Sequence, residues 1–116
     1  MEKLDLYEDR AIRLILENPN KYENKFDFVK ALRSKGIAIR EEIGGAQREV
    51  DSNNRIKGDI GAITADGTIT KLGKERFIEG VVWLDEKSVS HYTEVDYISL
   101  TKKGKEYCKQ RFPNFK

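Results

Sequence analysis

The first 35 residues carry apolar side chains at steps of three and four, the spacing of an amphipathic helix. The pattern predicts a helix over residues 5–18, with Asp5 as its N-cap and Glu8 as the capping-box partner. This helix should end at Asn18, because the residue before a proline disfavours helical backbone angles. A second helix is expected over residues 24–35, capped by Asn24. Its inward face should hold Phe28, Val29 and Leu32.

The pattern is less regular over the next twenty residues. Gly36 lies where a left-handed residue commonly ends a helix. Apolar residues then recur at roughly helical spacing, but Gly44 and Gly45 interrupt them, and each glycine costs a helix about 1 kcal/mol relative to alanine. We favour a short helix near residues 42–52, and the alternative is a turn at the two glycines.

From about residue 59 the spacing changes from helical to alternating, which is typical of strands. Residues 60–70 are expected to form a hairpin, because Asp66-Gly67 tolerates the positive φ angles of a two-residue turn. A short helix over residues 71–79 should follow. A further hairpin is expected over residues 81–100, in which strand 81–84 pairs with strand 94–101 across a polar loop. The last helix is predicted over residues 102–112.

A nine-residue motif occurs twice, over residues 69–77 and 100–108. Each copy has an apolar residue, then Thr-Lys, any residue, Gly-Lys-Glu and two bulky residues. We interpret both copies as junctions from a strand into a helix, in which the threonine caps the helix and the glycine allows close packing. A true internal duplication and a chance match remain the alternatives.

Composition indicates a single domain over residues 1–116, with 38% hydrophobic and 36% charged residues. No apolar run reaches the ~18–20 residues of a membrane span, and no signal-peptide core is evident. One cysteine, Cys108, excludes an internal disulfide. These features together predict a cytoplasmic protein.

The net charge is only +2, but charge is unevenly distributed. Residues 101–116 hold six Lys or Arg and one Glu, or +5. Residues 30–48 hold five Lys or Arg and two Glu, or +3. Residues 85–96 hold four Asp or Glu and one Lys, or −3. The chain is therefore divided into basic and acidic stretches.

No constellation of residues favours catalysis, a cofactor or a metal site. His91, the only histidine, lies in a polar stretch and is interpreted as a solvated loop residue. Cys108 falls on the expected inward side of the last helix and is interpreted as a small buried hydrophobe. One histidine and one cysteine cannot supply a typical metal centre. We therefore expect a protein that is not an enzyme.

The strand Tyr97-Ile98-Ser99-Leu100, which runs through Thr101 into a Lys-x-Gly-Lys-Glu helix, resembles the end of many winged-helix domains. The expected order of three helices, hairpins and a last helix also resembles this superfamily, an α+β class. The resemblance implies that the third helix enters the DNA major groove and that the protein is a small transcriptional regulator or mobile-element accessory protein. The residues it assigns to double-stranded DNA are Lys30, Arg33, Lys35, Gln47, Arg48, Asn54, Arg55 and Lys57.

The hairpin expected over residues 81–100 is the obvious wing, but its acidic tip would be repelled by phosphate, so the hairpin at Asp66-Gly67 is the alternative wing. The rival function is a protein-interaction module that uses the acidic hairpin 81–100 and its aromatic residues. These are Trp83, Tyr92 and Tyr97, although the domain core is the commoner place for a tryptophan. A homodimer through the C-terminal helix is a further expectation that the resemblance implies.

Overall fold

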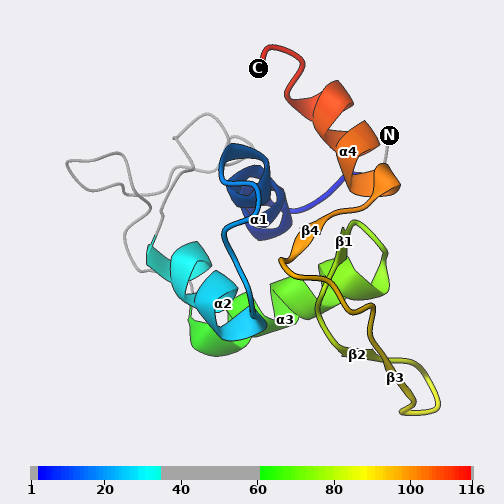
Figure 1. Ribbon diagram of the computed structural model, residues 1–116. Helices are drawn as coiled ribbons and strands as arrows, with labels where there is room; N and C mark the ends of the chain where they lie inside the picture. The colour runs from blue at the N-terminus through cyan, green and yellow to red at the C-terminus, as the bar shows by residue number, and fades with distance from the viewer. Residues whose placement is uncertain (1–2, 35–60, 116) are drawn as a thin grey trace.

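The computed structural model describes residues 3–34 and 61–115 (Figure 1). These residues form an α+β arrangement of helices, short antiparallel strand pairs and a C-terminal helix. In chain order the elements are α1 (Leu6–Glu17), α2 (Lys25–Ser34), α3 (Ala62–Lys74), β1 (Ile78–Glu79), β2 (Trp83–Leu84), β3 (Ser90–His91), β4 (Ser99–Leu100) and α4 (Lys102–Arg111). The predicted Gly36 helix end and the helix near residues 42–52 lie outside the described residues.

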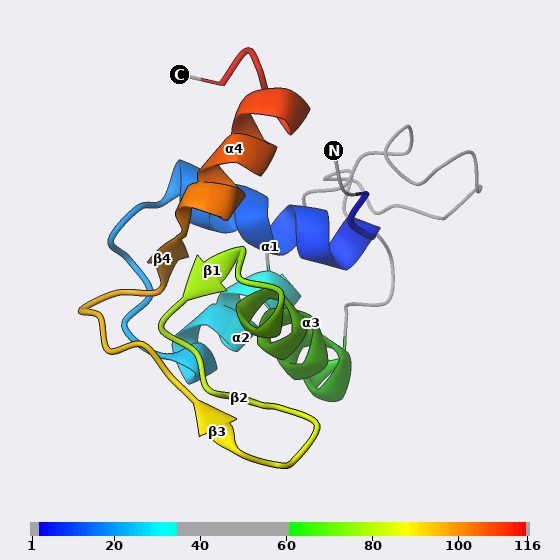
Figure 2. The ribbon, with the colours of Figure 1, turned by 90° about the vertical axis from the view of Figure 1, so that its right-hand side faces the viewer.

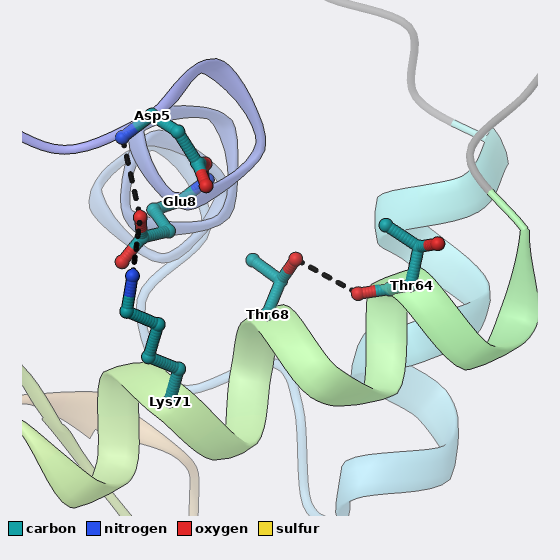
Figure 3. Close-up of polar contacts among 5 residues, drawn as sticks. All are labelled: Asp5, Glu8, Thr64, Thr68 and Lys71. Atoms are coloured by element: carbon teal, nitrogen blue, oxygen red, sulfur yellow. Dashed lines mark hydrogen bonds and ion pairs between the residues drawn. The ribbon is translucent and has the colours of Figure 1, made fainter.

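Helix α1 begins with the capping box that its sequence predicts. The Asp5 carboxylate accepts a hydrogen bond from the Glu8 backbone N–H at 2.7 Å, and the Glu8 carboxylate accepts one from the Asp5 N–H at 3.2 Å (Figure 3). A cap of this kind stabilises a helix by about 1 kcal/mol. The centre of the apolar stripe of α1, including Ile12 and Leu14, is buried, and Tyr7 and Leu16 at its ends are partly buried. Local capping and core packing therefore agree here.

Helix α2 is also confirmed. The Asn24 side-chain oxygen accepts a hydrogen bond from the Asp27 N–H at 2.9 Å, as a capping residue does. Phe28 and Leu32 are completely buried, and the Tyr22 ring stacks on the Phe28 ring with centroids 4.9 Å apart. The inward face that the sequence assigns to this helix is thus the face that packs.

The hairpin predicted for residues 60–70 is wrong, because this segment belongs to α3. Ala65, Ile69 and Leu72 lie three and four residues apart and are all completely buried, so they form the inward stripe of a helix. Helix α3 packs against both α1 and α2. This packing outweighs the turn preference of Asp66-Gly67, as tertiary contacts commonly outweigh local propensity.

The strands pair differently from the prediction. Strand β2 pairs with β3, with Trp83 opposite His91, and strand β1 pairs with β4, with Ile78 opposite Leu100. The tight turn between β2 and β3 is closed by the Asp85 carboxylate, which accepts hydrogen bonds from two backbone N–H groups, those of Lys87 and Val89. The region expected to be a loop therefore contains β3. The predicted pairing of residues 81–84 with 94–101 is wrong, because these strands belong to two separate pairs.

The two copies of the repeated motif have different local structures. The second copy is the predicted junction, since Thr101 is the N-cap of α4 and accepts a hydrogen bond from the Gly104 N–H at 3.1 Å. The prediction for the first copy is wrong, because Thr70 lies within α3. The chain there passes from a helix into strand β1, and not from a strand into a helix. The helix predicted over residues 71–79 is corrected in the same way, since α3 ends at Lys74.

Both copies nevertheless meet in space, and both glycines pack closely, as predicted. The Thr101 N–H donates to the Phe77 carbonyl at 3.1 Å, and the Phe77 and Tyr107 rings meet edge to face. A Cβ atom on Gly104 would lie 2.2 Å from the Phe77 carbonyl oxygen, and one on Gly73 would lie 2.4 Å from a Val81 methyl carbon. Neither position has room for alanine.

Helix α1 lies between α4 on one side and α2 with α3 on the other (Figures 1 and 2). Strands β1 and β4 lie beside α1, while the β2–β3 hairpin extends to the end of the molecule opposite the C-terminus. Tyr107 and Cys108 are buried residues of α4, as predicted for the cysteine. None of the helices in residues 3–34 and 61–115 is long and apolar enough to cross a membrane.

Candidate nucleic-acid interface

Two of the eight residues assigned to DNA by the sequence can be placed. Lys30 and Arg33 are exposed on α2, one turn apart. Both line a groove of about 810 Å³ between α2 and α3, so they lie beside the first residues of α3. The other six residues lie outside the described part of the chain: Lys35, Gln47, Arg48, Asn54, Arg55 and Lys57.

Helix α3 is the described helix that directly precedes the strands. One side of it is buried against α1 and α2, and the other side is exposed. The exposed side consists mostly of small or short side chains, and the larger ones stand at its ends. In chain order it includes Ala62, Ile63, Thr64, Asp66, Gly67 and Lys74, with Thr70 half-buried. This helix surface could not be predicted from the sequence, because the turn preference of Asp66-Gly67 assigned the segment to a hairpin.

Gly67 occupies the middle of this exposed side. A Cβ atom added there would meet no atom within 4 Å among the described residues, and its backbone is not in the positive-φ region. Neither packing nor backbone geometry therefore requires a glycine, although glycine costs a helix interior about 1 kcal/mol relative to alanine. Because glycine has no side chain, another molecule can approach the helix backbone closely at this position.

Charge near the exposed side of α3 is mostly positive. Asp66, an acidic residue on that side, has its carboxylate 2.9 Å from the Lys25 ammonium, which also donates to the Thr70 hydroxyl. The Asp66 charge is therefore compensated within the protein. Lys30 and Lys74 have no ion-pair partner among the described residues, so they are available to an anion.

Lys71 differs from Lys74, because it connects α3 to the buried Glu8 of α1 (Figure 3). The Lys71 ammonium lies 3.5 Å from the Glu8 carboxylate, and Thr68 beside it donates to the Thr64 carbonyl at 2.8 Å. Burial raises the pKa of Glu8, while the Glu8 charge raises the pKa of Lys71. Lys71 therefore compensates a core carboxylate and is a structural residue.

The β2–β3 hairpin carries a stack of aromatic and charged groups. The Trp83 and His91 rings are parallel with centroids 4.2 Å apart, and the Arg76 guanidinium lies 5.8 Å from the Trp83 ring centroid. His91 also contacts the Asp85 carboxylate at 2.9 Å, and this hydrogen bond, with two from the backbone, lowers the pKa of Asp85. The prediction of a solvated loop histidine is wrong, since His91 is half-buried on β3.

Other chemistry at the described residues is sparse. Burial raises the pKa of the Cys108 thiol to about 11, which keeps it protonated and unreactive at neutral pH. No three His, Cys, Asp or Glu side chains gather to hold a metal ion in residues 3–34 and 61–115. The absence of a catalytic arrangement stays a prediction for the whole chain.

The structure defines a small α+β protein with an exposed, lysine-flanked helix next to a hairpin. Comparison with protein-family models, with curated proteins and with solved structures finds no match to this chain.

Proposed function

We propose that this protein binds duplex DNA in the manner of a winged-helix domain, with α3 lying against the major groove. Two features support the proposal. The described elements run helix, helix, helix, antiparallel strands and helix, and the last strand ends at Leu100, directly before Thr101, which caps α4. A protein that reads sequence in this way would be a small transcriptional regulator or a mobile-element accessory protein.

The exposed side of α3 is the observation that carries the proposal. Small residues there let the helix backbone approach the bases, and a Cβ at Gly67 would meet no atom of the described residues within 4 Å. Thr64 is exposed and Thr70 half-exposed on this side, and a threonine hydroxyl can donate to or accept from several base edges. The helix therefore offers close approach together with groups that can read sequence.

Positive side chains flank this side and suit phosphate contacts. Lys30 and Arg33 flank it on α2, and Lys74 flanks it at the last turn of α3. Three phosphate contacts give a slope of about −2.7 in log K against log salt, which is about a 40-fold loss of affinity between 50 and 200 mM salt. Phosphate contacts from Arg48, Arg55 and Lys57 would steepen this slope further.

Anisotropy with a labelled duplex of mixed sequence, measured at these two salt concentrations, tests the proposal. The wild type should bind at low salt with at least the slope above. Lys74→Glu should weaken binding and reduce the slope by about 1, because one phosphate contact is lost. Lys21→Glu is the matched control, since it changes the net charge equally at an exposed residue between α1 and α2.

Two results would contradict this function. The first is a wild-type protein that binds no duplex at about 50 mM salt, where non-specific contacts are strong. The second is equal weakening by Lys74→Glu and Lys21→Glu, which would indicate a diffuse attraction to net charge and no defined site at α3.

A further inference from the structure

The β2–β3 hairpin has an apolar side that the described fold leaves exposed. Seven large hydrophobic side chains are exposed among the described residues, and four of them lie on this hairpin: Val82, Leu84, Val89 and Tyr92. Trp83 stacks with His91 and approaches Gly73 of α3. Because side chains alternate along a strand, Leu84 of β2 projects from the side opposite Trp83. Such a patch on a two-stranded hairpin marks an interaction surface.

The charge around this patch indicates which kind of surface can bind it. Residues 85–96, which include the hairpin tip, carry a net charge of −3. Glu86 at the tip and Glu94 beyond β3 are both exposed. A phosphate backbone would be repelled by this segment, whereas a surface that is both apolar and basic would fit it.

The same chain carries a surface of that kind. A groove of about 350 Å³ runs along α4 and the C-terminal residues, and its lining includes Leu16, Leu100, Phe112 and Phe115. The exposed Lys105 and Lys109 also line it. Residues 101–116 carry a net charge of +5, so an apolar, acidic hairpin finds both its apolar and its charged complement there.

The hairpin lies at the end of the molecule opposite α4 and the C-terminus (Figures 1 and 2), and this groove is lined mostly by residues of α4 and the C-terminal segment. One copy therefore cannot join them within itself. Two copies placed side by side in opposite directions can join them twice, and a twofold arrangement of this kind is closed. Pairing of α4 with its own copy would instead bring two strongly positive segments together, which like-charge repulsion opposes.

We propose that the chain forms a twofold-symmetric dimer in which the β2–β3 hairpin of each copy packs into the α4 groove of the other. Leu84 and Tyr92 supply the apolar contacts, and the glutamates of the hairpin face Lys105 and Lys109. This dimer does not depend on the proposed DNA binding, since it uses the hairpin and α4 rather than α3.

Light scattering after size-exclusion chromatography, or sedimentation equilibrium, tests the dimer with the whole chain at about 100 µM, which detects dimers of micromolar affinity. The wild type should have the mass of a dimer. Leu84→Ser with Tyr92→Ser should weaken the dimer at least tenfold. The Leu84 and Tyr92 side chains are both more than half exposed, so the fold should persist in this variant, which circular dichroism verifies. Lys21→Glu, outside both surfaces, is the control and should stay dimeric.

A charge exchange makes the test specific. Glu86→Lys with Glu94→Lys should give monomers, and so should Lys105→Glu with Lys109→Glu, because each pair places like charges in both contacts. An equimolar mixture of the two variants should restore a dimer, since both contacts are then complementary. A monomeric wild type would overturn the proposal. So would a dimer that resists all these changes, or a mixture that stays monomeric.

Discussion

Replacing Gly67 by alanine is expected to stabilise the protein, and the sign of the effect tests the assignment of α3. Gly67 lies in the interior of α3 on its exposed side, and a Cβ there meets nothing within 4 Å among the described residues. The substitution should therefore recover the helix propensity that glycine lacks, about 0.8–1.0 kcal/mol. For a chain of this size, such a gain raises the midpoint of thermal unfolding by about 4 °C.

The opposite sign is expected if residues 60–70 form the hairpin that the sequence favours. A glycine in the turn of such a hairpin has a positive φ, and alanine there destabilises by about 1 kcal/mol. Chemical denaturation followed by circular dichroism separates these outcomes, because they differ by about 2 kcal/mol. A destabilised Gly67→Ala variant would refute α3 over Ala62–Lys74.

Gly104→Ala is the matched comparison, because this glycine also lies within a helix but has no room. Its Cβ would lie 2.2 Å from the Phe77 carbonyl oxygen, and overpacking against backbone typically costs about 1–3 kcal/mol. The proposed function adds a second readout, since Gly67→Ala should weaken duplex binding while it raises stability. Unchanged binding would leave the helix intact but remove the reason proposed for the glycine.

Three further predictions concern local contacts. Thr101→Ala should lower the free energy of unfolding by about 1 kcal/mol through loss of the α4 cap. Thr70→Ala, at the same position of the other motif copy, removes a hydrogen bond from Lys25 but no helix cap, so its loss should be smaller. Equal losses in denaturant melts would contradict the difference between the copies. The pKa of Glu8 is raised in the folded state, so the folded protein keeps the Glu8 proton to a higher pH than the unfolded chain does. Glu8 therefore makes stability fall as the pH rises above 4.5, the ordinary pKa of a glutamate. Glu8→Gln keeps the capping-box acceptor and should flatten that part of the pH profile, and an unchanged slope would show that another group causes it. With a pKa of about 11, Cys108 has a thiolate fraction of about 10⁻³ at pH 8, so a thiol reagent should label it rapidly only in denaturant; fast labelling of the native protein would disprove its burial.

The sequence was a good guide wherever the signal was local. Asp5 and Glu8 form their capping box, Asn24 begins α2, and Thr101 begins α4, because a cap depends on residues three positions apart. The buried position of Cys108 followed from helical spacing in the same way. Of the residues assigned to DNA, Lys30 and Arg33 lie beside the first residues of α3, and the other six lie outside the described residues, so the assignment stays a prediction.

Long-range pairing was beyond the reach of the sequence. Short strands have few side chains to fix their partners, so residues 81–84 could be matched with 94–101 on pattern alone. The tight turn at Asp85 instead matches β2 with β3, and the Thr101 and Phe77 backbones meet beside the pair formed by β1 and β4. The Trp83–His91 stack follows from that register, and no property of either residue alone predicts it.

Local sequence signals were sufficient to predict the first two helices and the last one, because caps and apolar spacing act within one or two turns of chain. The sequence also determined the division into an acidic hairpin and a basic C-terminal segment. Whether residues 62–74 form a helix or a hairpin depends on tertiary packing. Ala65, Ile69 and Leu72 fit a helical stripe, whereas Asp66-Gly67 fits a turn. Burial against α1 and α2 stabilises the stripe by more than the turn preference offers, and that choice is what exposes the proposed DNA-binding side of α3.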